Sequence, residues 1–112
     1  MLFTTWKVEE EEYKLRLNAS ACVKLEEDLN QNPISVLQSI SEDNLPKLET
    51  LLRIIHASMT AFNHGIKLTD VYGIYDKWVD EGHGFADLVP IVLDIFKCSG
   101  FIPDQAEDNG KN

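Results

Sequence analysis

The longest stretch with an unbroken helical rhythm covers residues 45–64, LPKLETLLRIIHASMTAFNH. At 3.6 residues per turn, its large apolar side chains fall within an arc of about 100°, the width of a stripe that faces a protein core. A second side carries small apolar residues that let another helix approach closely. We therefore expect a central helix with neighbours on two sides. The expected core stripe consists of Leu48, Leu51, Leu52, Ile55, Met59 and Phe62.

The N-terminal segment follows a period of two instead. Tyr13, Leu15 and Leu17 alternate with polar residues, and the preceding stretch over residues 2–8 is rich in threonine and aromatic side chains, a pattern typical of strands. The expected turn, residues 9–12, is a run of four glutamates without Gly, Asn or Pro. Two strands alone are marginal in water, so this β-hairpin should pack on helices. Its free edge could also join a second copy of the chain.

Several further helices are indicated by their caps. Asn18 or Ser20 can begin a helix that runs to about residue 29, and Asn32 followed by Pro33 begins a short one. Gly65 should end the central helix with a positive φ. Two more helices are expected over residues 70–81 and 85–99. The predicted fold class is α+β, predominantly helical, with an N-terminal β-hairpin packed on about four to five helices in a single domain over residues 1–102. Residues 103–112 are polar and acidic, and predict a disordered tail.

The last helix is apolar over about 200° of its circumference, far wider than one buried stripe. Beside its obvious core set of Leu88, Ile91, Val92 and Ile95, the helix has a second apolar set that something must cover. This second set either belongs to the core of a domain packed on three sides, or it anchors another chain. The candidate partner-binding residues are Val89, Leu93, Phe96, Phe101 and Ile102.

Composition excludes several classes of function. The 112 residues carry a formal net charge of −9 and their Lys and Arg residues are scattered, which argues against binding to nucleic acid or to an anionic membrane. The sequence contains neither an export signal nor an apolar run of the roughly 18 to 20 residues that span a bilayer. We therefore expect a cytoplasmic protein in which Cys22 and Cys98 are reduced, buried and inert.

Signatures of catalysis are missing from the sequence. Two of the three histidines, His56 and His64, lie about 12 Å apart along one helix at 1.5 Å per residue, which is too far to share a metal ion. No nucleophile motif surrounds Ser58, Ser99 or the cysteines, and the six glycines form no phosphate-binding loop. We expect no enzyme activity, no metal and no cofactor.

Four segments, EYKLRLNASACVKLEEDLNQNP, LPKLETLLRIIHASMTAFNHGI, VYGIYDKWVDEGHG and DLVPIVLDIFKCSGFI, cover most of residues 13–102. In order and spacing they resemble the small tail assembly chaperones of long-tailed bacteriophages, particularly those that infect Gram-positive hosts. One departure lies after Leu29, where related chains often carry a glycine near the helix end and this chain has Asn30, Gln31 and Asn32 in the turn. Asn tolerates left-handed backbone geometry, so the same fold is expected.

The resemblance implies a small, helix-rich, acidic protein without catalytic residues. It implies binding to the hydrophobic tape-measure protein, which such chaperones keep soluble until tail-tube subunits replace them. The tail tube protein and further copies of the same chain are additional partners to consider. The resemblance also implies the host cytoplasm as location and absence from the mature virion.

The residues themselves leave two other functions open. One is a self-assembling structural or adaptor protein that joins copies through its last helix and its strand edge. The other is a small acidic regulatory inhibitor that mimics nucleic acid with its carboxylates.

Overall fold

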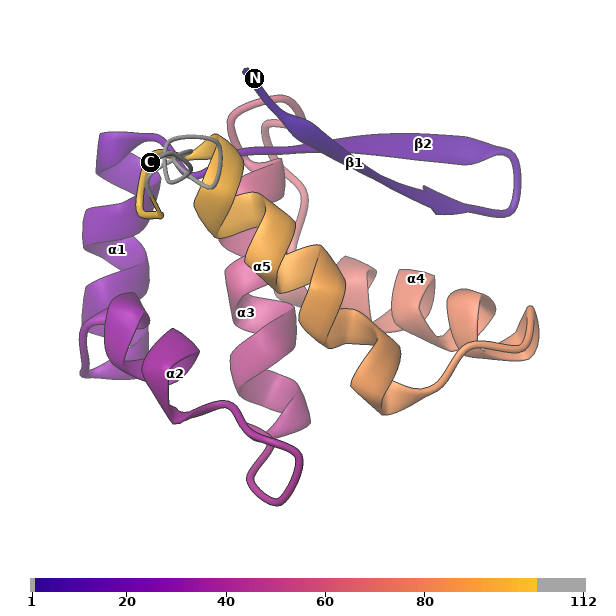
Figure 1. Ribbon diagram of the computed structural model, residues 1–112. Coiled ribbons are helices and arrows are strands. Elements are labelled where there is room, and N and C mark those ends of the chain that lie inside the picture. The colour runs from indigo at the N-terminus through magenta and orange to yellow at the C-terminus, as the bar shows by residue number, and fades with distance from the viewer. Residues whose placement is uncertain (1, 103–112) are drawn as a thin grey trace, which may run out of the picture.

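The computed structural model describes residues 2–102 as a β-hairpin followed by five α-helices (Figure 1). This confirms the predicted α+β, predominantly helical fold with an N-terminal hairpin. The expected tail, residues 103–112, lies outside the described residues. Within the described part, every helix is too short or too polar to cross a bilayer. The elements are β1 (Thr4–Val8), β2 (Glu11–Leu15), α1 (Ala19–Leu29), α2 (Pro33–Ser39), α3 (Leu48–Met59), α4 (Leu68–Asp80), the 3-10 turn η1 (Phe85–Asp87) and α5 (Leu88–Cys98).

The turn of the hairpin is stabilised by contacts with α4 and contains no glycine. β1 and β2 pair antiparallel with Val8 opposite Glu11, so the turn consists of two glutamates. Glu9 has a φ of 56°, in the left-handed region that few non-glycine residues adopt, and its N–H donates to Glu81 Oε2 at 2.7 Å. The buried Trp6 packs its ring against Trp78 of α4 in an edge-to-face arrangement, with centroids 5.6 Å apart. Tertiary contacts therefore fix a turn that local sequence does not favour.

Three asparagines begin or end the first two helices, as the sequence predicts. Asn18 Oδ1 accepts the Ala21 N–H at 2.9 Å and caps α1, while Asn32 Oδ1 accepts the Ile34 N–H at 2.9 Å and caps α2. Asn30 ends α1 in the left-handed conformation with a φ of 56°.

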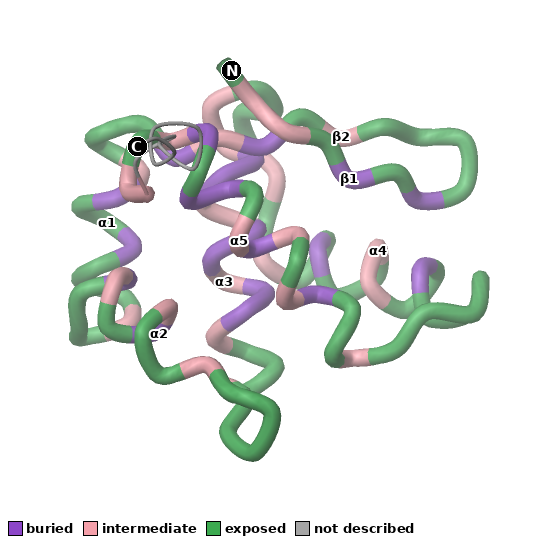
Figure 2. Tube along the Cα trace, in the orientation of Figure 1, coloured by how far each residue is buried: buried purple, intermediate pink, exposed green. Residues whose placement is uncertain are grey.

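α3 is the central element, in contact with α1, α4, α5 and β2 (Figure 1). Figure 2 shows buried positions along most of its length. Because neighbours surround it, even Ile54 and Ser58, which lie outside the expected stripe, are fully buried.

The expected length of the central helix was wrong at both ends. α3 starts at Leu48, after Pro46, and ends at Met59, beyond which the chain turns until Gly65, whose φ of 89° is positive as predicted. Leu48 and Phe62 are therefore not core residues: they are 37% and 44% exposed, because one starts the helix and the other follows its last turn.

Residues 15–17 tie the hairpin to the C-terminal ends of α3 and α5. The Arg16 N–H donates to the Ser58 carbonyl at 2.9 Å, and Arg16 Nη1 donates to the carbonyls of Leu2 and Cys98 at 2.9 and 3.2 Å. The Leu17 N–H donates to Ser99 Oγ at 2.9 Å. This junction joins segments that lie 82 residues apart in the chain.

Candidate partner-binding groove

An apolar groove lies between α3 and α4, which contact each other. It has a volume of about 330 Å³ and is open to solvent. Leu52, which is 2% exposed, joins it to the core, whereas Leu48 and Tyr72 are each 37% exposed. We call this feature the α3–α4 groove; its lining residues are Leu48, Glu49, Leu52, Tyr72, Tyr75 and Asp76.

The apolar surface continues along α4. Val79, which is 37% exposed, lies one helical turn beyond Tyr75, and Tyr72 lies almost one turn before it. Single exposed apolar residues are normal on a protein surface, but a contiguous group beside a hollow is typical of a binding surface. The groove and this extension are therefore the strongest candidate for partner binding in the described residues.

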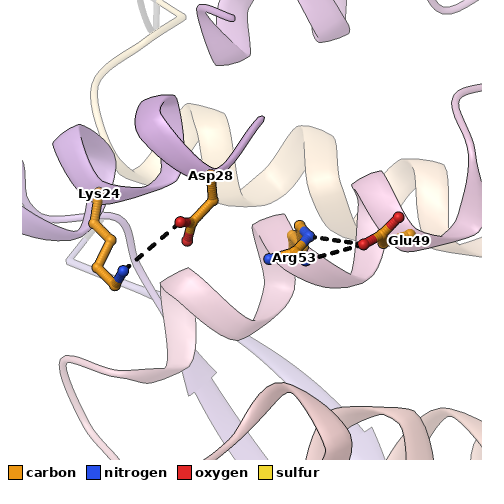
Figure 3. A network of polar contacts seen from close by, with 4 residues as sticks. All are labelled: Lys24, Asp28, Glu49 and Arg53. Atoms are coloured by element: carbon orange, nitrogen blue, oxygen red, sulfur yellow. Dashed lines mark hydrogen bonds and ion pairs between the residues drawn. The ribbon is translucent and has the colours of Figure 1, made fainter. Parts of the chain in front are cut away.

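Both charged residues that line the groove are acidic. The Glu49 carboxylate is held by Arg53 on the same helix, with Oε2 accepting from Nε at 3.1 Å and from Nη2 at 2.9 Å (Figure 3). The ion pairs of residues 2–102 are this one, Lys24–Asp28 and Lys77–Glu9, so Asp76 has no cationic partner in the described part of the chain. No Lys or Arg lines the groove. The groove therefore combines an apolar interior with one uncompensated negative charge, that of Asp76, at its edge.

A second hollow, of about 510 Å³, opens between α2 and the start of α3. Its lining is mostly polar and includes Lys47 and Asn44, with a few apolar side chains such as Val36. A polar, solvated hollow of this kind offers little apolar area to a polypeptide.

The five residues that the sequence suggests for partner binding differ in how far the structure buries them. Phe96 is fully buried in the core, so its ring is out of reach of a partner. Phe101 and Ile102 are partly buried and pack against the core; the Phe101 ring meets Phe96 edge-to-face at 5.5 Å. Val89 and Leu93 are half-buried and do not pack against the core cluster. α5 is thus mainly a core helix with two half-exposed apolar side chains.

The α3–α4 groove was not found from the sequence. Leu48 was assigned to the core stripe of α3, because its angular position matches that stripe. Helical periodicity shows on which side of a helix a residue lies. It does not show whether a neighbouring element covers that side at the first turn of the helix. A usable signal lies in α4, where Tyr72, Tyr75 and Val79 recur at helical spacing beside Val71 and Trp78, giving a second apolar side.

Two histidines and both cysteines make structural contacts. His56 Nε2 lies 2.8 Å from the Ile66 carbonyl, and His83 stacks on Trp78 with centroids 4.3 Å apart and planes inclined by 8°. Cys22 and Cys98 are free and buried, as expected; burial raises the pKa of the Cys22 thiol, with a smaller contribution from Glu26. Across residues 2–102, no cluster of three or more His, Cys, Asp or Glu residues could hold a metal ion.

Comparison with known proteins gives one result. No curated protein and no solved structure matches the chain. One family model, described as "Family of unknown function (DUF6096)", matches residues 3–112. The match includes the hairpin, every helix and the residues of the α3–α4 groove. This protein therefore belongs to the DUF6096 family.

Proposed function

We propose that this protein is a non-enzymatic tail assembly chaperone of a long-tailed bacteriophage. In this role it binds the hydrophobic tape-measure protein in the host cytoplasm and keeps it soluble during tail morphogenesis. It leaves before the virion is complete. The resemblance of residues 13–102 to such chaperones supports the proposal.

The α3–α4 groove is the structural observation that supports this proposal most directly. A chaperone must present apolar surface to its client and yet stay soluble itself. Leu48 and Tyr72 provide exposed apolar surface, while the net charge of −9 disfavours aggregation of the chaperone.

Coexpression with the cognate tape-measure protein tests the proposal. We expect more soluble tape-measure protein, and co-purification of the two chains, compared with coexpression of an unrelated acidic protein of similar size. Mass spectrometry of purified virions should detect the tape-measure protein and not this chain. No gain in soluble client together with no co-purification would contradict the proposal.

Self-assembly is a second candidate function, favoured by the hairpin. Each of its two strands has an outer edge that no other strand within residues 2–102 covers, and open edges can pair with another chain. Light scattering over a concentration series distinguishes the two functions. A stable oligomer at all concentrations supports the structural role, and a mostly monomeric protein supports the chaperone.

A further inference from the structure

We infer that the α3–α4 groove binds an amphipathic helix whose apolar stripe is flanked by Lys or Arg residues. This inference rests on the proposed function for the source of that helix, which is the client polypeptide. The type of helix follows from the shape, the apolar lining and the charge of the groove.

The shape favours a helix laid along α4. Tyr72, Tyr75 and Val79 span two turns of α4, or about 10 Å at 1.5 Å per residue. Tyr72 and Tyr75 line one side of the groove, whose other side is the start of α3, and Val79 continues the same side of α4 beyond the groove. Helices bind in such grooves through apolar anchors at positions i, i+3 or i+4, and i+7, which cover the same length.

The volume of the α3–α4 groove limits how many side chains of the partner it can hold. About 330 Å³ is at the low end of the range for small-molecule pockets. The hollow is also open, so it suits a few side chains of a passing polypeptide better than an enclosed ligand. Each contact is then weak, and a long client would be covered by many copies that exchange readily.

Charge decides between kinds of amphipathic helix. Asp76 lies at the groove without a cation among the described residues, Glu49 lies opposite it on α3, and Asp80 follows Asp76 by one turn of α4. Arg53 already pairs with Glu49, so Asp76 and Asp80 carry the uncompensated negative charge within residues 2–102. Lys or Arg beside the apolar stripe of a partner would pair with these two carboxylates, whereas acidic residues at the same places would be repelled by them.

Fluorescence anisotropy with designed peptides tests the inference on the full-length protein. The probe is a labelled Leu–Lys helix of about 14 residues, or four turns, with Leu at one side. A Leu–Glu peptide with the same Leu positions tests charge, and a scrambled Leu–Lys peptide of identical composition tests amphipathicity. We expect the Leu–Lys helix to bind at least about tenfold more tightly than either comparison peptide.

Variants locate the binding site. Tyr72→Ala and Leu48→Ser each remove an exposed side chain of the groove, and each should weaken binding by about tenfold. Asp76→Asn should weaken binding by about two- to fivefold, in keeping with a solvent-exposed ion pair. Glu10→Gln, which removes one charge from the exposed hairpin turn, is the matched control and should leave binding unchanged. Circular dichroism shows that each variant keeps its helical content.

Three results would overturn the inference. The first is absence of binding to the Leu–Lys helix. The second is equal weakening by Asp76→Asn and Glu10→Gln, which would show attraction by net charge alone. The third is weakening by Leu93→Ala but not by Tyr72→Ala, which would place the contact on α5.

The same variants separate this inference from the proposed function. If both wild-type protein and Tyr72→Ala solubilise the tape-measure protein equally, the function holds and the groove assignment fails. If the groove binds the Leu–Lys helix but the wild-type protein gives no soluble client, the groove assignment holds and the chaperone function fails.

Discussion

At the scale of single residues, Arg16 makes the most widely distributed contacts. Its backbone binds the end of α3, and its guanidinium binds one carbonyl near the N-terminus and one at the end of α5. A cation beside the last carbonyls of a helix also interacts favourably with the helix dipole. The alternation pattern placed Arg16 at a polar position of a strand, and it gave no indication of these distant acceptors.

Replacing Arg16 with Ala should lower the free energy of unfolding by about 1–3 kcal/mol, because the Leu2 and Cys98 carbonyls lose a charged donor. Urea unfolding measures the change. Lys24→Ala is the control, since this exposed residue forms only a surface pair with Asp28 and should cost less than about 0.5 kcal/mol. Equal losses for the two variants would show that the Arg16 contacts contribute nothing specific.

Tyr13 of β2 makes the stability of the protein depend on pH in the alkaline range. Partial burial raises the pKa of its hydroxyl above 10.0, and Glu11 and Glu9 raise this pKa further by repelling the phenolate. The folded state holds the Tyr13 proton more tightly than the unfolded state does. The contribution of this proton to the free energy of unfolding is therefore fully present below about pH 10, and it is lost as the pH rises through the pKa of Tyr13 in the folded state.

Stability measured by urea unfolding should therefore decrease more steeply above pH 10 for the wild-type protein than for Tyr13→Phe, which cannot ionise. The two proteins are identical at every other position, so the difference isolates Tyr13. Parallel pH profiles would contradict the assigned direction of the pKa shift.

At the scale of elements, local signals predicted the N-caps of α1 and α2 but not those of α3 and α4, which begin after Lys47 and Lys67. The side chains of Asn18 and Asn32 bind N–H groups two or three residues away, so sequence alone placed these two caps correctly. The turn at Glu9 depends on Glu81, 72 residues away, and no local pattern could specify it. α3 is shorter than the sequence prediction at both ends. The apolar spacing extends over residues 45–64, but the chain is helical only over Leu48–Met59.

α5 allows a test of its two apolar sides. Ile95 is fully buried, whereas Leu93 is half-buried outside the core cluster. Ile95→Asp should prevent folding, because an unpaired carboxylate would have to enter the core. Leu93→Asp should remain folded and lose about 1 kcal/mol or less. Circular dichroism and thermal unfolding measure both, and loss of the fold in Leu93→Asp would show that the whole of α5 is core.

At the scale of the whole molecule, charge opposes compactness. The net charge is −9, and the three ion pairs within residues 2–102 all lie at the surface. Surface pairs contribute little, so repulsion among the carboxylates is only partly offset. Composition predicted this property fully, because net charge does not depend on the fold.

Adding salt should therefore stabilise the protein. Raising NaCl from about 0.02 to 0.5 M shortens the range of the repulsion, and we expect the thermal midpoint to rise by roughly 2–6 °C. The double variant Glu10→Lys/Glu11→Lys changes the net charge from −9 by +4 to −5 and should show a smaller rise. An unchanged or lower thermal midpoint in salt would mean that charge repulsion does not contribute significantly to the stability of the protein.

The junction at residues 15–17 also determines how the protein can be handled in experiments. Because Arg16 binds both Cys98 and Ser58, the C-terminal end of α5 is tied to the end of α3 that lies ten residues, or about 15 Å, from Leu48. A fluorophore or surface linker attached at this end of α5 would therefore stand away from Leu48. Copies immobilised in this way would leave the Leu48 end of the α3–α4 groove free to meet a soluble polypeptide.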